Sequence, residues 1–388
     1  MRVGLTFKRF TAGLVSITCA LLCQSVVAAA DLVLRNGNVY TMDSAGRRFT
    51  SVAVSGDTLV WVGDETGVGA WIDAQTRVID LAGRTVFPGF IDTHIHTMDT
   101  LPLINGVMLS PSQSAEEVLN AIAAHAAAYP AQNPVLGAGF LARAFGIDGP
   151  RAEDLDRIIP DRPALIIDEG GHTAWANSLA LAAAGITADT PDPVPGAHFY
   201  QRDADGNPTG WLVEGAAIEP VMNTLSVVSL AALRQSAPGF FKLMSSVGLT
   251  AAFDAGMIDT GELGMALAAE MAADGTLPVR LVGSLYVNRP DDLAVAREKL
   301  ADLSTRYRSE FFNVTTLKLS LDGTVEAKTA VTIEPYVLPE GHRAQPLLPQ
   351  PEVMAAVSQA LADNVDLHLH AIGDGSVRNA LDAIEQAQ

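Results

Sequence analysis

The chain has 388 residues, of which 48% are hydrophobic and 18% are charged, and its formal net charge at neutral pH is −19. This composition predicts one large or two ordinary globular domains and excludes disorder as the state of the whole chain. The strong negative charge argues against nucleic acid and anionic membranes as partners, because both repel an acidic surface.

Residues 1–30 have the pattern of a secretory signal peptide. Three basic residues precede an apolar run from Phe10 to Cys23, and small residues end the segment. The apolar run is shorter than the roughly 20 residues that span a bilayer, and no later stretch qualifies. We therefore expect an exported protein, periplasmic or secreted, with no membrane attachment after cleavage of the signal.

The leader also contains both cysteines of the chain, Cys19 and Cys23. The mature protein is therefore expected to have no disulfide and no thiolate ligand or nucleophile. The leader holds three of the 25 basic residues and none of the 44 acidic ones, so the remainder carries a formal charge of −22. We interpret this charge as a solvated acidic surface that keeps an exported protein soluble.

Residues 31–87 read as a series of short strands separated by glycine, aspartate and asparagine turns, which predicts a small β-sandwich domain. From residue 88 to 388 the pattern changes to strand-then-helix units, which is typical of a parallel sheet or barrel with helices outside. The expected strands of this second domain are 85–96, 249–254, 278–287, 314–320 and 365–371. The expected helices are 260–273, 291–306, 351–363 and 375–388.

The segment from about residue 101 to 239 does not repeat this unit. It contains a predicted helix at 114–128, with Ser114 as N-cap and Glu117 completing a capping box. A buried strand at 164–168 and a segment rich in Pro, Gly and Asp follow. We interpret the whole as an insertion over one mouth of a barrel, although it could instead supply ordinary barrel strands.

The number of strands falls short of a complete barrel. A (β/α)8 barrel needs eight strands, and the pattern gives about five before the sequence ends inside the fifth unit's helix. The expected fold class is therefore α/β, an incomplete (β/α)8 TIM-like barrel beside a small N-terminal β-sandwich. Either the sequence is a fragment or the insertion hides further strands.

The most informative motif is Asp92-Thr93-His94-Ile95-His96, which follows an apolar strand and a Pro-Gly entry. Residues two apart on a strand face the same side, so His94 and His96 should project together at its carboxyl end, where barrel active sites form. Two adjacent imidazoles supply half of a divalent metal site. Asp92 lies on the same face and could orient a ligand. A chance pair facing solvent is the alternative, which the apolar context disfavours.

Lys318 lies within an apolar, strand-forming run from 316 to 321. A buried ammonium group is costly unless it is paired or chemically altered. Carboxylation by carbon dioxide would turn the amine into an anionic oxygen ligand able to bridge two metal ions. A lysine that extends to solvent or pairs with Asp322, and a Schiff-base lysine as in barrel aldolases, remain alternatives.

A second pair of histidines lies on the last predicted strand, which runs into a glycine turn and a helix. His368 and His370 share one face by the same alternation. His370 lies nearer the carboxyl end, so we predict it as a metal ligand. His368 lies deeper and is interpreted as a packed, hydrogen-bonded histidine.

Together these motifs resemble the amidohydrolase superfamily, and within it amidohydrolase family 3, which includes N-substituted formamide deformylases. The resemblance covers the sequence from Asp31 to its end, in five ordered blocks: residues 31–36, 88–96, 171–178, 317–323 and 370–374. It implies a β-sandwich beside a distorted barrel that holds one or two divalent metal ions, with zinc as the expected metal.

Carried over residue by residue, the resemblance makes His94, His96, Lys318 and His370 the metal ligands, with Lys318 N6-carboxylated. It places His172 near the substrate and makes Asp322 a second substrate-binding residue. Asn177 belongs to the same motifs, with helix capping as its structural alternative, as a turn is for Asp322.

The family also uses a later histidine and a later aspartate, and the aspartate is the usual proton acceptor. Neither occurs within this sequence, so it contains no predicted general base. We expect an exported hydrolase that acts on carbon–nitrogen bonds other than peptide bonds, in small-molecule amides or formamides. The alternatives are an inactive metal-binding remnant of such an enzyme and, third, a Schiff-base aldolase. Nothing in the sequence indicates the substrate's identity or the oligomeric state.

Overall fold

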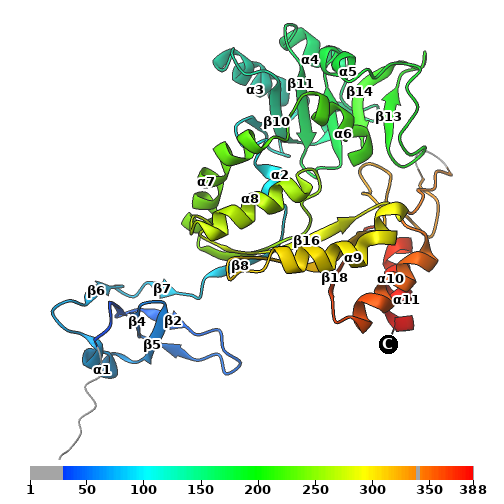
Figure 1. The fold of residues 1–388 in the computed structure, drawn as a ribbon. Helices are drawn as coiled ribbons and strands as arrows, with labels where there is room; N and C mark the ends of the chain where they lie inside the picture. The colour runs from blue at the N-terminus through cyan, green and yellow to red at the C-terminus, as the bar shows by residue number, and fades with distance from the viewer. Residues whose placement is uncertain (1–28, 338–340, 388) are drawn as a thin grey trace, which may run out of the picture. The chain divides into compact units, whose positions relative to one another are not determined.

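The computed structural model describes residues 29–337 and 341–387, so the predicted signal peptide lies outside the described residues except for its last two. The chain divides after Pro88 into two compact units, of which the second is the larger. The first unit takes the blue end of the colour scale in Figure 1, and the second runs from cyan to red.

The first unit contains two small sheets and little helix. Its core is formed by Ala30, Val33, Ala53 and Val68, against which the short helices α1 (Glu65–Val68) and η1 (Gly69–Trp71) pack. One sheet has the order β5-β4-β1-β6 and the other β3-β2-β7. That these sheets form the expected sandwich stays a prediction. The strands are β1 (Leu32–Arg35), β2 (Asn38–Tyr40), β3 (Arg48–Phe49), β4 (Ser51–Ser55), β5 (Thr58–Gly63), β6 (Arg77–Asp80) and β7 (Thr85–Val86).

A five-stranded parallel sheet forms the base of the second unit, in the order β18-β17-β16-β15-β8. The predicted α/β class is confirmed, and this curled sheet fits the predicted incomplete TIM-like barrel. Its strands are β8 (Phe90–Ile95), β15 (Leu249–Asp254), β16 (Arg280–Val287), β17 (Phe312–Ser320) and β18 (Asp366–His370).

Five helices pack against this sheet in one hydrophobic core, which includes Leu233, Met265, Leu281, Leu300 and Leu317. Figure 1 shows them following the strands in alternation toward the red end of the chain. They are α7 (Leu230–Ser246), α8 (Gly261–Ala273), α9 (Pro290–Arg306), α10 (Gln350–Ala362) and α11 (Asp374–Ala387). Within residues 29–337 and 341–387, no helix combines the length and the apolar character needed to cross a bilayer.

The prediction of one continuous strand over residues 85–96 is wrong. The structure has β7 and β8 with a break between them, at the division of the two units. Pro88 cannot donate a ladder hydrogen bond, which ends the first strand. Gly89 is needed for close packing, because a Cβ atom there would lie 2.2 Å from Thr250 Cγ2.

Residues 107–213 form a sheet of their own, in the order β13-β14-β12-β11-β10-β9, and do not extend the five-stranded sheet. The pairs β9–β10 and β10–β11 are parallel and the others antiparallel. The strands are β9 (Val107–Met108), β10 (Val135–Phe140), β11 (Ala164–Asp168), β12 (Thr173–Ala176), β13 (Phe199–Arg202) and β14 (Pro208–Val213).

Short helices connect and cover this second sheet. The capping box of Ser114 and Glu117 is present at the start of α3, as the sequence predicts. Two apolar clusters, one on Leu165 and Leu212 and the other on Phe140 and Trp175, fill the space between helices and strands. The helices are α2 (Thr97–Thr100), α3 (Ala115–Ala128), η2 (Ala142–Phe145), α4 (Ala152–Ile158), α5 (Ser178–Ala183) and α6 (Gly215–Thr224).

Candidate active site

A cavity of about 550 Å³ lies between the carboxyl ends of the parallel strands and the six-stranded sheet. The first sheet contributes His94 from β8, His96 directly after β8, and Ser320 at the end of β17. The second sheet contributes His172 after β11 and Glu214 after β14. The carboxyl ends of barrel strands are where the active sites of this architecture form.

Three histidines and a lysine lie next to one another near the carboxyl ends of the parallel strands, and two of them, His94 and His96, line the cavity. The ring centroids of His94 and His96 lie 5.7 Å apart, and those of His94 and His368 lie 4.9 Å apart. Lys318 Nζ lies 3.2 Å from His368 Nε2. This proximity follows from the sheet register, which places Lys318 opposite His368 on neighbouring parallel strands. We call His94, His96, Lys318 and His368 the histidine–lysine cluster.

His370 lies apart from the centre of this cluster. Its ring faces that of His172 at 5.7 Å, and its Nε2 donates to the carbonyl oxygen of Gly323 at 3.3 Å. The sequence interpretation gave the ligand role to His370 and a packing role to His368. In the structure His368 is the residue beside Lys318, so both ligand roles stay predictions.

The ring of His96 is oriented by the backbone. Its Nδ1 lies 2.7 Å from the carbonyl oxygen of Gly256, which can only accept, so Nδ1 carries the proton. The lone pair is therefore on Nε2. Such a backbone contact behind an imidazole fixes its tautomer in metal sites. Asp92 has a local role, because its Oδ1 accepts the backbone N–H of His94.

Burial lowers the pKa of His94, Lys318 and His368. It lowers the pKa of His94, with the charge of Lys318 adding to the effect, and it lowers the pKa of His368 to about 4. Lys318 is only 2% exposed, and burial lowers its pKa to about 8. At neutral pH the imidazoles of His94 and His368 therefore carry free lone pairs and part of the lysine is unprotonated. These are the forms that bind metal ions and react with carbon dioxide.

The donor set fits a divalent ion in kind, since imidazoles and a buried lysine amine lie next to one another. Within the described part of the chain, however, no three His, Cys, Asp or Glu side chains are close enough to hold an ion by themselves. Lys318 would therefore have to take part in binding. The histidine–lysine cluster is a candidate metal centre of which Lys318 is an essential member.

Two other predicted residues have structural partners. Asp322 is fully buried, and its carboxylate accepts the backbone N–H groups of Val331, Ile372 and Gly373 at 2.8, 3.0 and 2.9 Å. It joins the loops that follow β17 and β18, and it also lines the cavity. Asn177 is fully buried and caps α5 by accepting from the backbone N–H of Ala180. Substrate contact by Asp322 stays a prediction.

The predicted substrate-side residue His172 has a partner that the sequence reasoning missed. Glu214 Oε2 accepts from His172 Nδ1 at 2.8 Å. Burial alone would lower the pKa of His172, but the hydrogen bond and charge of Glu214, with that of Asp168, outweigh it and raise the pKa. Burial would raise the pKa of Glu214, and the same pairing lowers it instead. His172 and Glu214 thus form a buried ion pair on the cavity wall.

An acidic group behind His96 was also missed. Asp99 accepts from the backbone N–H of Ile258, Asp259 and Thr260, and Asp254 accepts from Thr97 and Gly256. Burial raises the pKa of Asp254 to about 6 and that of Asp259 to about 7, and the neighbouring charge of Asp99 adds to both shifts. Only the position of Asp254 at the end of an apolar strand could have indicated it.

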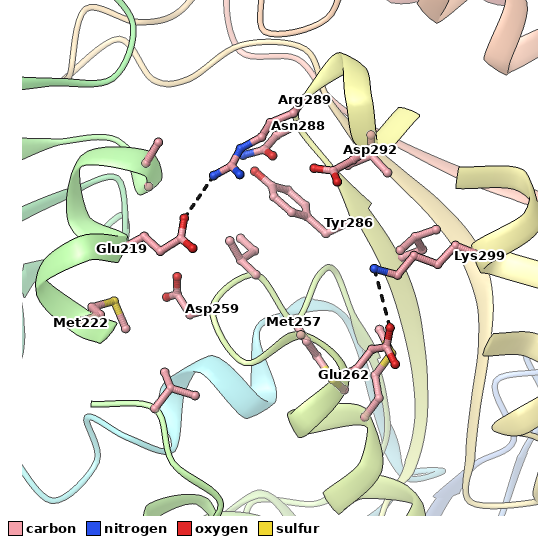
Figure 2. A pocket seen from close by; sticks show the side chains of 18 of the residues that line it. Glu219, Met222, Met257, Asp259, Glu262, Tyr286, Asn288, Arg289, Asp292 and Lys299 are labelled. Atoms are coloured by element: carbon pink, nitrogen blue, oxygen red, sulfur yellow. Dashed lines mark hydrogen bonds and ion pairs between the residues drawn. The ribbon is translucent and has the colours of Figure 1, made fainter. Parts of the chain in front are cut away.

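A second pocket of about 280 Å³ adjoins the cavity. Figure 2 shows that Asp259 and Tyr286 point into it, between the ion pair of Glu219 with Arg289 and that of Glu262 with Lys299. Both spaces are lined by Gly215, Met222, Ile258, Asp259, Tyr286 and Asn288. The pocket therefore extends the cavity away from the histidine–lysine cluster.

Solved structures share this fold. An uncharacterised metal-dependent hydrolase from Pyrococcus horikoshii OT3 superposes with a TM-score of 0.65 at 20% identity, covering 91% of this chain and 68% of that chain. Identity at this level supports the fold and not a shared activity.

Relatives in sequence extend the likeness. Exoenzymes regulatory protein AepA of Pectobacterium carotovorum is 30% identical over 380 residues, which are 97% of this chain and 80% of AepA. N-substituted formamide deformylase of Arthrobacter pascens is 37% identical over 190 residues, 48% of this chain and 35% of that enzyme. The match thus spans about a third of the deformylase.

Residues 77–388 match the sequence profile of the Amidohydrolase family, which covers the whole second unit and with it the cavity described above. The resemblance inferred from the five motif blocks is confirmed. The chain belongs to the amidohydrolase superfamily, in amidohydrolase family 3, and is an enzyme of the hydrolase type.

Proposed function

We propose that this protein is a metal-dependent hydrolase of carbon–nitrogen bonds other than peptide bonds, acting on small-molecule amides or formamides. The observation that carries the proposal is the grouping of His94, His96, His368 and Lys318, of which His94 and His96 line a cavity. The relative named N-substituted formamide deformylase supports this substrate class.

One or two divalent ions, zinc in our proposal, would be held by His94, His96 and Lys318 together with His368 or His370. Such an ion lowers the pKa of water and polarises a carbonyl group. Lys318 fits this role best as its N6-carboxylated form, because burial favours the neutral amine that reacts with carbon dioxide. Carboxylation also replaces a positive charge beside the imidazoles with an anionic oxygen ligand.

His172 would meet the substrate on the opposite wall of the cavity. Its ring is held by Glu214 and lies against His370, so it faces the region between the two sheets. An N–H donor there can hydrogen-bond a carbonyl oxygen and stabilise the negative charge that develops on it. The adjoining pocket leaves room for a substituent on the substrate.

The cellular location that we propose rests on residues 1–30. We propose that it is exported to the periplasm or secreted, as the basic, apolar and small-residue pattern of residues 1–30 supports. Its partner would then be an external small molecule, and the acidic composition argues against nucleic acid.

The direct test uses the full chain, stripped of metal with a chelator and reloaded with zinc. Release of formate from N-substituted formamides should require zinc and should be lost in the double variant His94→Asn, His96→Asn. His125→Asn is the matched control, since His125 lies on α3 and pairs with Gln132 away from the cavity. Turnover that survives removal of all metal would contradict the proposal.

The second candidate, a metal-binding remnant without turnover, is favoured by one observation. The described residues contain no preformed group of three His, Cys, Asp or Glu ligands. Zinc that is retained through dialysis without any turnover would support this candidate. The Schiff-base alternative predicts that borohydride with a carbonyl compound traps Lys318, and that chelators have no effect.

A further inference from the structure

Glu214 has a backbone conformation that its residue type rarely adopts. Its φ and ψ angles are 67° and 159°, a region occupied almost only by glycine. It precedes α6 in the N-cap position, yet its side chain makes no capping hydrogen bond. The strained backbone therefore does not serve the helix. It directs a 5% exposed carboxylate into the wall of the cavity.

The contacts of this carboxylate are specific at both oxygens. Oε2 accepts from His172 Nδ1 at 2.8 Å, and Oε1 accepts from the hydroxyl of Thr329. The backbone N–H of Glu214 also donates to the carbonyl oxygen of His172 at 2.7 Å, so the two residues are joined twice. Among the described residues, the other ring nitrogen of His172, Nε2, has no hydrogen-bond partner.

The loop after β17 has room for this arrangement because residue 323 is a glycine. A Cβ atom at Gly323 would lie 2.2 Å from Glu214 Oε1 and 2.0 Å from Thr329 Oγ1. Gly323 follows Asp322 at the end of β17, and its carbonyl accepts from His370. The loop after the Lys318 strand thus fits closely around the Glu214 carboxylate, which links the two sides of the cavity.

We propose that Glu214 is a positioning residue for the hydrolytic site: by accepting Nδ1–H of His172 it holds that ring with Nε2 directed at the substrate amide. This inference rests on the proposed function, which gives His172 its substrate. It predicts that the backbone strain at Glu214 is retained for the orientation of His172 and not for stability.

Two substitutions separate orientation from structure. Glu214→Gly relieves the backbone strain and removes the carboxylate, so the melting temperature should hold or rise while kcat/KM falls about 10- to 100-fold. Glu214→Gln keeps an oxygen that can accept Nδ1–H and should restore most of the activity. Ser226→Gly is the matched control, because Ser226 is exposed just beyond α6, has a φ of 52° and lies away from the cavity. It should not change kcat/KM.

The orientation itself is read by nitrogen NMR of histidine-labelled protein at a pH of about 9, where histidine side chains are neutral. The His172 signals are assigned by their absence in His172→Asn. The wild type and Glu214→Gln should show a protonated, hydrogen-bonded Nδ1, and Glu214→Gly should lose this signal.

This result supports the positioning role even if no formamide is hydrolysed, in which case only the proposed function fails. A wild-type His172 that carries its proton on Nε2 and none on Nδ1, or a Glu214→Gln variant as impaired as Glu214→Gly, would overturn the inference.

Discussion

The two sheets of the second unit contribute to the cavity in different ways. The parallel sheet supplies His94, Lys318 and His368 from regular strands, in which alternation and register alone bring side chains together. The six-stranded sheet supplies His172 and Glu214 from the turns after its strands, one of them in a strained conformation. The predicted metal ligands thus lie on or directly after regular strands, whereas the residues predicted on the substrate side lie in turns.

The largest expected effect on activity distinguishes the parallel-sheet side of the cavity from the side formed by the six-stranded sheet. The double variant His94→Asn, His96→Asn should lose bound zinc and reduce kcat/KM by more than about 10³-fold, since it removes half of the predicted ligands. His172→Asn should keep the zinc and reduce kcat/KM by about 10²-fold, as expected for loss of one donor to the substrate carbonyl. Metal analysis beside steady-state kinetics checks both. If His172→Asn also loses zinc, the division between the two sides is wrong.

Lys318 provides a sharper test of the parallel sheet. Lys318→Met keeps the apolar shape and removes the amine, so kcat/KM should fall by about 10²-fold. The metal-free variant should nevertheless unfold at a higher temperature than the metal-free wild type, because a 2% exposed amine no longer has to be desolvated. Calorimetry of both metal-free proteins measures this. A lower melting temperature would show that the amine is paired and not merely buried.

How much of this site the sequence predicts depends on the same difference. Strand alternation correctly identifies His94 and His96 as neighbours, because a period of two fixes which side chains of one strand share a face. Lys318 lies on another strand, and the family resemblance, not alternation, assigned it to the site. Register is a long-range property, so the sequence could not show that His368, and not His370, lies opposite Lys318. The separate sheet formed by residues 107–213 was equally hidden, since its pairing is mostly antiparallel and depends on distant partners.

The amino-acid sequence gives only a weak indication that Glu214 belongs to the site. It is the one charged residue in the apolar run from Trp211 to Ile218, where an acid is unexpected unless it is paired. Neither its positive φ nor its distance to His172 can be read from the sequence. Glu214, in the turn after β14, therefore needed the structure, whereas alternation along one strand was enough to place His94 beside His96.

Asp322 tests whether a residue predicted on the substrate side acts through structure. Asp322→Asn replaces one carboxylate oxygen with an amide that cannot accept, so one or two of the three backbone N–H groups lose their partner. The free energy of unfolding should fall by about 3 kcal/mol, because buried donors without partners are costly. Urea denaturation measures this change. A normal stability with a raised KM would instead assign Asp322 to substrate binding.

The smallest effect concerns Asp259, where the cavity meets the adjoining pocket. Burial, with the charge of Asp99, raises the pKa of Asp259 to about 7, whereas an unfolded carboxyl titrates near pH 4. The folded protein therefore binds more protons than the unfolded chain between about pH 4 and 7, and its stability must fall as pH rises through that window.

Asp259→Asn cannot ionise, so its melting temperature should match the wild type at about pH 4 and exceed it at about pH 8. The gain should be about 1 kcal/mol, since the carboxyl group, although protein atoms surround it, keeps access to solvent through the pocket. Asp99→Asn is the informative contrast: it removes the same repulsion but also one of the two acceptor oxygens, so one or two of the backbone N–H groups of Ile258, Asp259 and Thr260 lose their partner and the protein should be destabilised at every pH. If Asp259→Asn leaves the pH profile unchanged, repulsion within this acidic group does not limit the stability of the protein.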